Sequence, residues 1–189
     1  MTERNTFLRS MHDVGLAAWF GGTLMGAIGV NGAAEEAGSS PTDTARIASV
    51  GWAKWTPVNA AAITAHLIGA TGLLTANKAR LPYQRGLMAS TAAKTALTGL
   101  ALAATAYSRV LGKKVELSTS PDPDQADMST SHPVPLAQAQ RQLRLAQWAV
   151  PASTAALLIL NALHGEQQRP AEQLRGMVNK AVSRLNIHH

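Results

Sequence analysis

The sequence predicts an all-α protein, a bundle of about four weakly apolar transmembrane helices followed by an amphipathic C-terminal helix. Apolar residues make up 46% of the 189 residues and charged residues only 15%, below the roughly 25% that is usual in soluble domains. The charges gather between four apolar runs that are rich in Ala, Gly and Thr. Because mean hydropathy is only −0.01, this placement of charges carries the prediction, and the length fits one domain.

The first apolar run occupies Val14–Val30, and residues 14–34 carry no charge. A helix needs about twenty residues to cross the hydrocarbon core of a bilayer, so this run predicts the first span. The polar stretch EEAGSSPTDTAR follows. It predicts a loop in which Thr42 or Asp43 caps a short helix.

The second span is expected to begin at Pro57, because a proline in the first helical turn lacks only an N–H that would be unpaired there anyway. Paired tryptophans precede this proline, as interfacial anchors do, and Val58–Asn77 carries no formal charge. Leu87–Val110 predicts the third span, since Lys94 and Arg109 are its only formal charges.

The chain is expected to divide into three parts: 1–115 with the first three apolar helices, 116–135 as a flexible acidic loop, and 136–189 with the fourth helix and the tail. The loop is rich in Ser, Pro and Asp, which gives it too little apolar content to fold. The fourth run, Trp148–Leu163, is short for a span unless the helix that begins at Leu136 also enters the bilayer.

The C-terminal tail has apolar residues at helical spacing opposite Arg and Lys. This pattern predicts an amphipathic basic helix that binds a membrane surface or the groove of a partner protein. The residues expected to dock are Leu174, Arg175, Val178, Lys180 and Leu185.

The net charge of +6 is spread in short clusters between the apolar runs, without the aromatic interleaving of a nucleic-acid site, so no nucleic-acid partner is predicted. Lys and Arg are slightly more frequent on the side that would hold both termini, which predicts a cell-membrane protein with cytoplasmic termini. The lack of cysteine excludes disulfides, thiolate metal sites and a cysteine nucleophile.

Gly22 and Gly26 stand four residues apart in the first run, with Gly15 and Gly29 nearby. Glycines at this spacing let two helix backbones approach closely in lipid. We interpret them as helix-packing residues within the bundle, and a homo-oligomer contact is the alternative.

Ionisable residues inside apolar spans are costly and therefore count as functional candidates. If the first and third spans pack together, Asp13 and Lys94 can form an ion pair in one intramembrane polar layer with His66. In the alternative, Lys94 extends to the interface and His66 donates a hydrogen bond to a backbone carbonyl.

No sequence motif points to catalysis. Neither HxxE nor HExxH occurs on an apolar run, which argues against a metal, and nucleotide-binding loops and the GxSxG elbow are absent. We therefore expect a non-enzymatic protein without catalytic residues. An enzyme that uses His12, Asp13 or His66 as a proton relay is the least favoured alternative.

Four blocks, HDVGLAAWFGGTLMG, KWTPVNA, AKTALTGLALAATAYSRVLGKK and QWAVPASTAALLILNALHGEQQRP, resemble a group of small actinobacterial multi-span membrane proteins. The resemblance covers most of the chain except the acidic loop, and it implies a location and a build rather than a reaction. The build is also similar to the membrane-associated stalk subunit of a mycobacterial uptake hydrogenase, which scaffolds catalytic subunits and guides menaquinone.

These observations predict a membrane anchor or scaffold subunit whose partners are membrane lipid and the protein subunits of a larger complex. The alternative is a small membrane protein that binds a quinone or a lipid within its helix bundle. Small side chains on adjacent helices serve either function, since they allow tight contact or leave a groove. No cofactor beyond such a bound quinone or lipid is expected.

Overall fold

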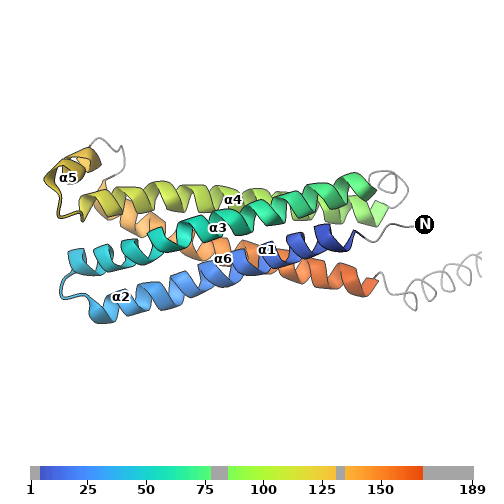
Figure 1. Cartoon of the computed structure of the whole chain (residues 1–189), viewed down its shortest axis with the longest axis horizontal. Helices are drawn as coiled ribbons and strands as arrows, with labels where there is room; N and C mark the ends of the chain where they lie inside the picture. Colours follow the sequence, from blue (N-terminus) through green and yellow to red (C-terminus); the bar gives the residue numbers. More distant parts are fainter. Residues whose placement is uncertain (1–4, 78–84, 131–134, 168–189) are drawn as a thin grey trace, which may run out of the picture.

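The computed structural model describes residues 5–77, 85–130 and 135–167, which form helices joined by short connections, with no strand among them (Figure 1). Four long helical rods run antiparallel and side by side, which confirms the all-α bundle. The first rod is continuous and combines three segments, and a short helix follows the third rod. The elements are α1 (Thr6–Met25), η1 (Gly26–Val30), α2 (Asn31–Ala37), α3 (Pro41–Asn77), α4 (Arg85–Ser118), α5 (Pro123–Thr130) and α6 (Leu136–Gln167).

The rods associate as two helix pairs. α1 packs mainly against α3, and α4 packs mainly against α6. The two pairs meet through α1 and α6 and, less extensively, through α3 and α4. α1 and α4 therefore lie diagonally across the bundle, although Nε1 of Trp19 on α1 donates to Oγ1 of Thr105 on α4 at 3.3 Å.

The turn before α3 is shorter than the sequence predicted, and its cap is Ser40 rather than Thr42 or Asp43. The hydroxyl of Ser40 accepts the backbone N–H of Asp43 at 3.2 Å, and the Asp43 carboxylate accepts the backbone N–H of Ser39 at 3.2 Å. These reciprocal bonds satisfy backbone donors at the helix start. Pro41 occupies the first helical position, where its missing N–H costs nothing.

Pro57 lies inside α3, so the prediction that a helix begins there is wrong. An interior proline removes one backbone hydrogen bond, but neighbouring Ser and Thr side chains help to keep such helices intact in membranes. The hydroxyl of Thr56 donates to the carbonyl of Trp52 at 2.9 Å. The second interior proline, Pro151 in α6, has a similar neighbour, because Thr154 donates to the carbonyl of Val150 at 2.8 Å.

Within the described residues, three helical stretches are long and apolar enough to cross a membrane: Thr6–Ala37, Pro41–Ala76 and Leu136–Leu163. At about 1.5 Å per residue, each exceeds the roughly 30 Å of a hydrocarbon core. α4 is not among them, which corrects the expectation that Leu87–Val110 is a fourth span of the same kind. Its many Thr residues and Lys94 lower its apolar character.

The segment 116–135, predicted to be a loop, contains helix in the structure. α4 continues to Ser118, and α5 spans Pro123–Thr130. Local capping explains α5, because the Asp122 carboxylate accepts the N–H of Asp124 at 3.1 Å and a proline begins the helix. Burial contributes little, since residues 121–125 are exposed. The low apolar content is therefore compatible with a short, capped helix.

Large apolar side chains cover the outside of the bundle. In the three apolar stretches, only 33%, 22% and 39% of the most apolar 18 residues are buried. The interior contains Leu16, Trp19, Leu111 and Leu157 together with small residues and the polar residues Thr23, His66, Ser153 and Thr154. The three hydroxyls donate to carbonyls of their own helices. Exposed large apolar residues occur on all four rods, as Val14, Met25, Ile28, Val50, Val58, Ile68, Leu100, Val110, Leu145, Trp148 and Ile159.

Candidate functional site

A cavity of about 870 Å³ lies between the two helix pairs, at the end of the bundle where α2 turns into α3. Its volume falls within the roughly 300–1,000 Å³ of small-molecule sites. All four rods contribute to its wall. Much of the wall is aromatic or aliphatic, from Trp52, Trp55, Ile63, Leu102, Leu143 and Val150.

Three polar atoms in this wall are shielded from solvent and have no hydrogen-bond partner: Nε1 of Trp55, Oδ1 of Asn59 and Oγ of Ser108. Trp55 and Asn59 stand one turn apart on α3, and Ser108 lies on α4 in the other helix pair. Buried polar atoms in proteins are nearly always paired, and each unpaired one costs about 1–3 kcal/mol. Protein atoms enclose all three, so they belong to residues of the wall but do not face its open space.

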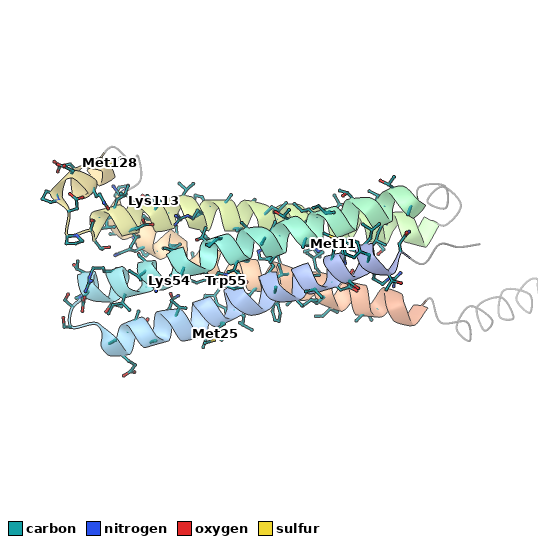
Figure 2. All side chains as sticks on the ribbon, viewed as in Figure 1. Met11, Met25, Lys54, Trp55, Lys113 and Met128 are labelled. Atoms are coloured by element: carbon teal, nitrogen blue, oxygen red, sulfur yellow. The ribbon has the colours of Figure 1, made fainter. Side chains whose placement is uncertain are left out.

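Glycines in the first rod position the two tryptophans of the wall. A Cβ atom at Gly22 would overlap the ring of Trp55, which is labelled in Figure 2, and a Cβ atom at Gly26 would overlap the ring of Trp52. Gly15 instead permits direct backbone approach, because its Cβ would lie 2.5 Å from both the Ala62 carbonyl oxygen and the His66 backbone nitrogen.

The fourth predicted packing glycine, Gly29, has a different neighbour. A Cβ atom there would meet the side chain of Met25, which belongs to the same rod. Of the four glycines, three therefore pack against α3 within the bundle. Two of these three accommodate indole rings rather than a second backbone.

A hydrogen-bonded bridge closes one side of the cavity. Nε1 of Trp52 donates to Oδ1 of Asn31 at 2.9 Å, and Nδ2 of Asn31 donates to Oε1 of Gln147 at 3.0 Å. The bridge joins α3, α2 and α6. Asn31 directly follows the π-helical turn η1, and an extra residue in such a turn rotates the residues after it. The π turn thus determines the direction in which the Asn31 side chain points.

Two acidic and two basic residues also line the cavity: Glu35, Arg109, Glu116 and Arg144. Glu116 accepts from Nζ of Lys113 at 2.7 Å and from Nη1 of Arg109 at 3.4 Å. Partial burial raises the pKa of Glu116, but Lys113 and then Arg109 outweigh it and hold this pKa below its usual value. Glu116 is therefore ionised at neutral pH, and the lining carries no net formal charge.

The predicted polar layer lies towards the other end of the bundle, and its pairing differs from the expectation. Asp13 pairs with Nδ1 of His12 at 2.8 Å, whereas Lys94 interacts with Asp13 only at longer range. Nδ1 of His66 donates to the carbonyl oxygen of His12 at 3.1 Å, and the two imidazole rings are 4.4 Å apart. The predicted Asp13–Lys94 ion pair is not formed, and the Asp13 carboxylate pairs with the neighbouring His12 instead.

Two other expectations concern metals and the tail. Within residues 5–77, 85–130 and 135–167, no group of three or more His, Asp or Glu side chains could hold a metal ion. The predicted docking residues Leu174, Arg175, Val178, Lys180 and Leu185 lie outside the described residues. The docking and scaffold function therefore stays a prediction.

The sequence analysis did not single out Asn31, Asn59, Ser108 or Gln147. The sequence alone could have pointed to Asn59, since it is an amide within a charge-free apolar run and stands one turn after Trp55. It could not have pointed to Ser108, because Ser108 is one of many hydroxyl residues in its run. The chain matches no protein-family model, no curated protein and no solved structure.

Proposed function

We propose that this chain is an integral protein of the cell membrane that holds an amphiphilic molecule, a lipid or a quinone, between its helix pairs. The observation that carries the proposal is the cavity of about 870 Å³ between the apolar helices, whose wall is largely aromatic and aliphatic but also contains charged residues. A hydrocarbon chain covers the tryptophan and leucine side chains, and a polar headgroup lies near the charged residues of the lining. We propose binding without a chemical step.

The distribution of side chains supports the membrane location. Large apolar residues point outwards on every rod, whereas buried hydroxyls bond to their own helices. In water this arrangement would expose a very large apolar surface. In lipid it is the ordinary arrangement, because small residues pack helices together and every buried polar group needs an internal partner.

A charge-free zone marks the part of the bundle that we place in the bilayer. It comprises residues 14–34, 55–77, 95–108 and 145–163. Its shortest stretch, 95–108, is about 20 Å long as a helix, and the long side chains of Lys94 and Arg109 extend it when they reach towards the interfaces. α4 then crosses as a packed member of the bundle, although it is less apolar than the other rods.

The start of α1 and the end of α6 then face one side of the membrane, because they lie at the same end of the bundle (Figure 1). The slight excess of Lys and Arg expected there favours the cytoplasm. The cavity lies at the opposite end, beside Arg109 and Arg144, which border the charge-free zone. An amphiphile at this level has its headgroup near the interface and its chain in the bilayer.

Lipid analysis of the purified protein tests this proposal. The full chain is extracted from membranes in a mild detergent, and co-purifying small molecules are identified by mass spectrometry. We compare wild type with a variant whose larger side chains fill part of the cavity, Ala60→Phe/Ala106→Phe, and with a matched control outside the lining, Ala61→Phe/Ala103→Phe. Wild type and control should retain one amphiphile, and the cavity variant should retain at least tenfold less. Recovery of wild type without any stoichiometric small molecule contradicts the proposal.

A further inference from the structure

Two histidines and two glycines form a reciprocal contact between α1 and α3, towards the end of the bundle opposite the cavity. A Cβ atom at Gly69 of α3 would overlap the backbone nitrogen of His12, and one at Gly15 of α1 would lie 2.5 Å from the backbone nitrogen of His66. Each glycine thus admits the backbone of the other helix at its histidine. This close approach brings the two imidazole rings to a centroid distance of 4.4 Å.

The hydrogen bonds of the two rings determine where each ring takes up a proton. Nδ1 of His66 lies 3.1 Å from the carbonyl oxygen of His12, and because a carbonyl can only accept, Nδ1 carries the hydrogen. Nδ1 of His12 likewise donates to the Asp13 carboxylate at 2.8 Å. In both neutral rings the lone pair is therefore on Nε2, and a proton added there brings a positive charge without breaking either bond.

Only one of the two positive charges that the rings can carry has a partner. In the described part of the chain, Asp13 is the one carboxylate that acts on this cluster, and it is bound to His12. Lys94 on α4 interacts electrostatically with Asp13 and with Arg9, so two further cations lie around the same carboxylate. α6 offers no counter-charge, because residues 145–163 include no ionisable side chain.

We propose that His12 and His66 form a pH-sensitive latch that holds α1 against α3. While the two rings carry at most one positive charge, the Asp13 carboxylate compensates it and the helices stay packed. His66 is only 1% exposed, so a second charge would be buried, close to the first and without a counter-charge, which is strongly unfavourable. Double protonation therefore separates α1 from α3 at this end and lets water reach the rings.

Protons reach the latch from the aqueous side. His12 and Asp13 precede the first charge-free run, and the Asp13 side chain is 57% exposed. The latch is independent of what the cavity binds, so it can be tested without a ligand.

Distances between pairs of spin labels test the latch. The chain has no cysteine, so two can be introduced without background labelling. Ser10→Cys with Thr75→Cys reports on the latch end of the two rods, and Ala33→Cys with Val50→Cys reports on their other end; all four positions are exposed. The full chain is placed in phosphatidylcholine nanodiscs. Electron paramagnetic resonance gives the distances at about pH 8 and about pH 4.5, on either side of the usual histidine pKa of about 6.5.

We expect a longer distance between the labels at the latch end, in a population that grows several-fold at the lower pH, and no change at the other end. His66→Gln keeps a donor for the His12 carbonyl but takes up no proton, so its distances should not depend on pH. His12→Gln also leaves a single titratable ring and should reduce the longer population. His132→Gln, which removes a histidine from another part of the sequence, should behave like wild type.

The remaining outcomes each contradict the latch. A single, unchanged distance in wild type at both pH values means that the helices stay packed whatever the charge. Separation in His66→Gln that equals wild type assigns it to another group, and a change at both ends means general acid unfolding. Size-exclusion chromatography at pH 8 checks folding. If His66→Gln does not fold, His12→Gln decides, because separation equal to wild type in that variant also overturns the proposal.

Discussion

The indole ring of Trp55 occupies the space that a side chain at Gly22 would need. The glycine thus permits α1 to approach α3 closely, and the Trp55 ring fills the gap and forms part of the cavity wall. Gly21, the preceding residue, has no neighbour within 4 Å of the position of a Cβ atom. The two adjacent glycines therefore form a natural comparison.

We predict that Gly22→Ala destabilises the protein by about 1–3 kcal/mol, because the added methyl group forces the Trp55 ring to move in a packed interior. Gly21→Ala should leave stability unchanged or raise it by about 0.5–1 kcal/mol, since alanine is the better helix former. Thermal unfolding in detergent, followed by circular dichroism, measures the difference. Equal unfolding temperatures for both variants would show that the Trp55 ring does not depend on Gly22.

Asn31 holds one side of the cavity through its bonds to Trp52 and Gln147. Asn31→Leu should lower stability by about 1–3 kcal/mol, since it leaves a buried donor and a buried acceptor without partners. Adding Gln147→Leu should recover part of this loss, because the orphaned amide is then removed as well. A double-mutant cycle on unfolding free energies gives the coupling, and strict additivity would mean that the bridge contributes nothing.

The placement of charges predicted the bundle, because the four apolar runs between the charged clusters are visible without any contact information. Helix boundaries were harder to predict. A proline after a polar stretch usually marks the start of a helix. Pro57 lies inside α3 because neighbouring residues in the folded chain compensate for its missing hydrogen bond. The capped turn at Asp122 likewise makes a helix from a segment whose composition favours a loop.

The candidate site was less predictable than the fold. Gly15, Gly22 and Gly26 could be identified as packing residues because their spacing alone places them on one helix face. The partner of Asp13 could not be identified, because it depends on side-chain orientations that spacing does not reveal: the carboxylate pairs with the preceding residue His12 rather than with Lys94. The Trp55, Asn59 and Ser108 group required the geometry of two helix pairs that meet only partly along their length.

Glu116 should give the protein a small acid-sensitive contribution to stability. Because its pKa is below its usual value in the folded chain, its ionised form stabilises the fold above the unfolded pKa of about 4.3. This contribution is lost as pH falls through the lower, folded pKa. The group is partly exposed, so we expect less than about 1 kcal/mol. Wild type should unfold at a higher temperature than Glu116→Gln at pH 7 and at the same temperature near pH 3.

The last prediction concerns whether α4 crosses the membrane. Leu100 is 56% exposed and lies within the charge-free stretch 95–108, whereas Val110 is 51% exposed on the same helix but beyond that stretch. If lipid surrounds α4, Leu100→Arg places a charge in the hydrocarbon region at a cost of about 2.5–3.5 kcal/mol on insertion scales. Val110→Arg places it next to Arg109, near the interface, where the cost is small.

We therefore expect Leu100→Arg to reduce the amount of folded protein in the membrane fraction several-fold, and Val110→Arg to leave it near the wild-type level. Fractionation followed by size-exclusion chromatography of the extracted protein measures both quantities. The two substitutions add the same side chain and the same charge at similar exposure, so neither the size nor the net charge of the new residue explains a different outcome. If both variants behave like wild type, or if wild type is recovered soluble without detergent, α4 is surrounded by water and the membrane proposal is wrong.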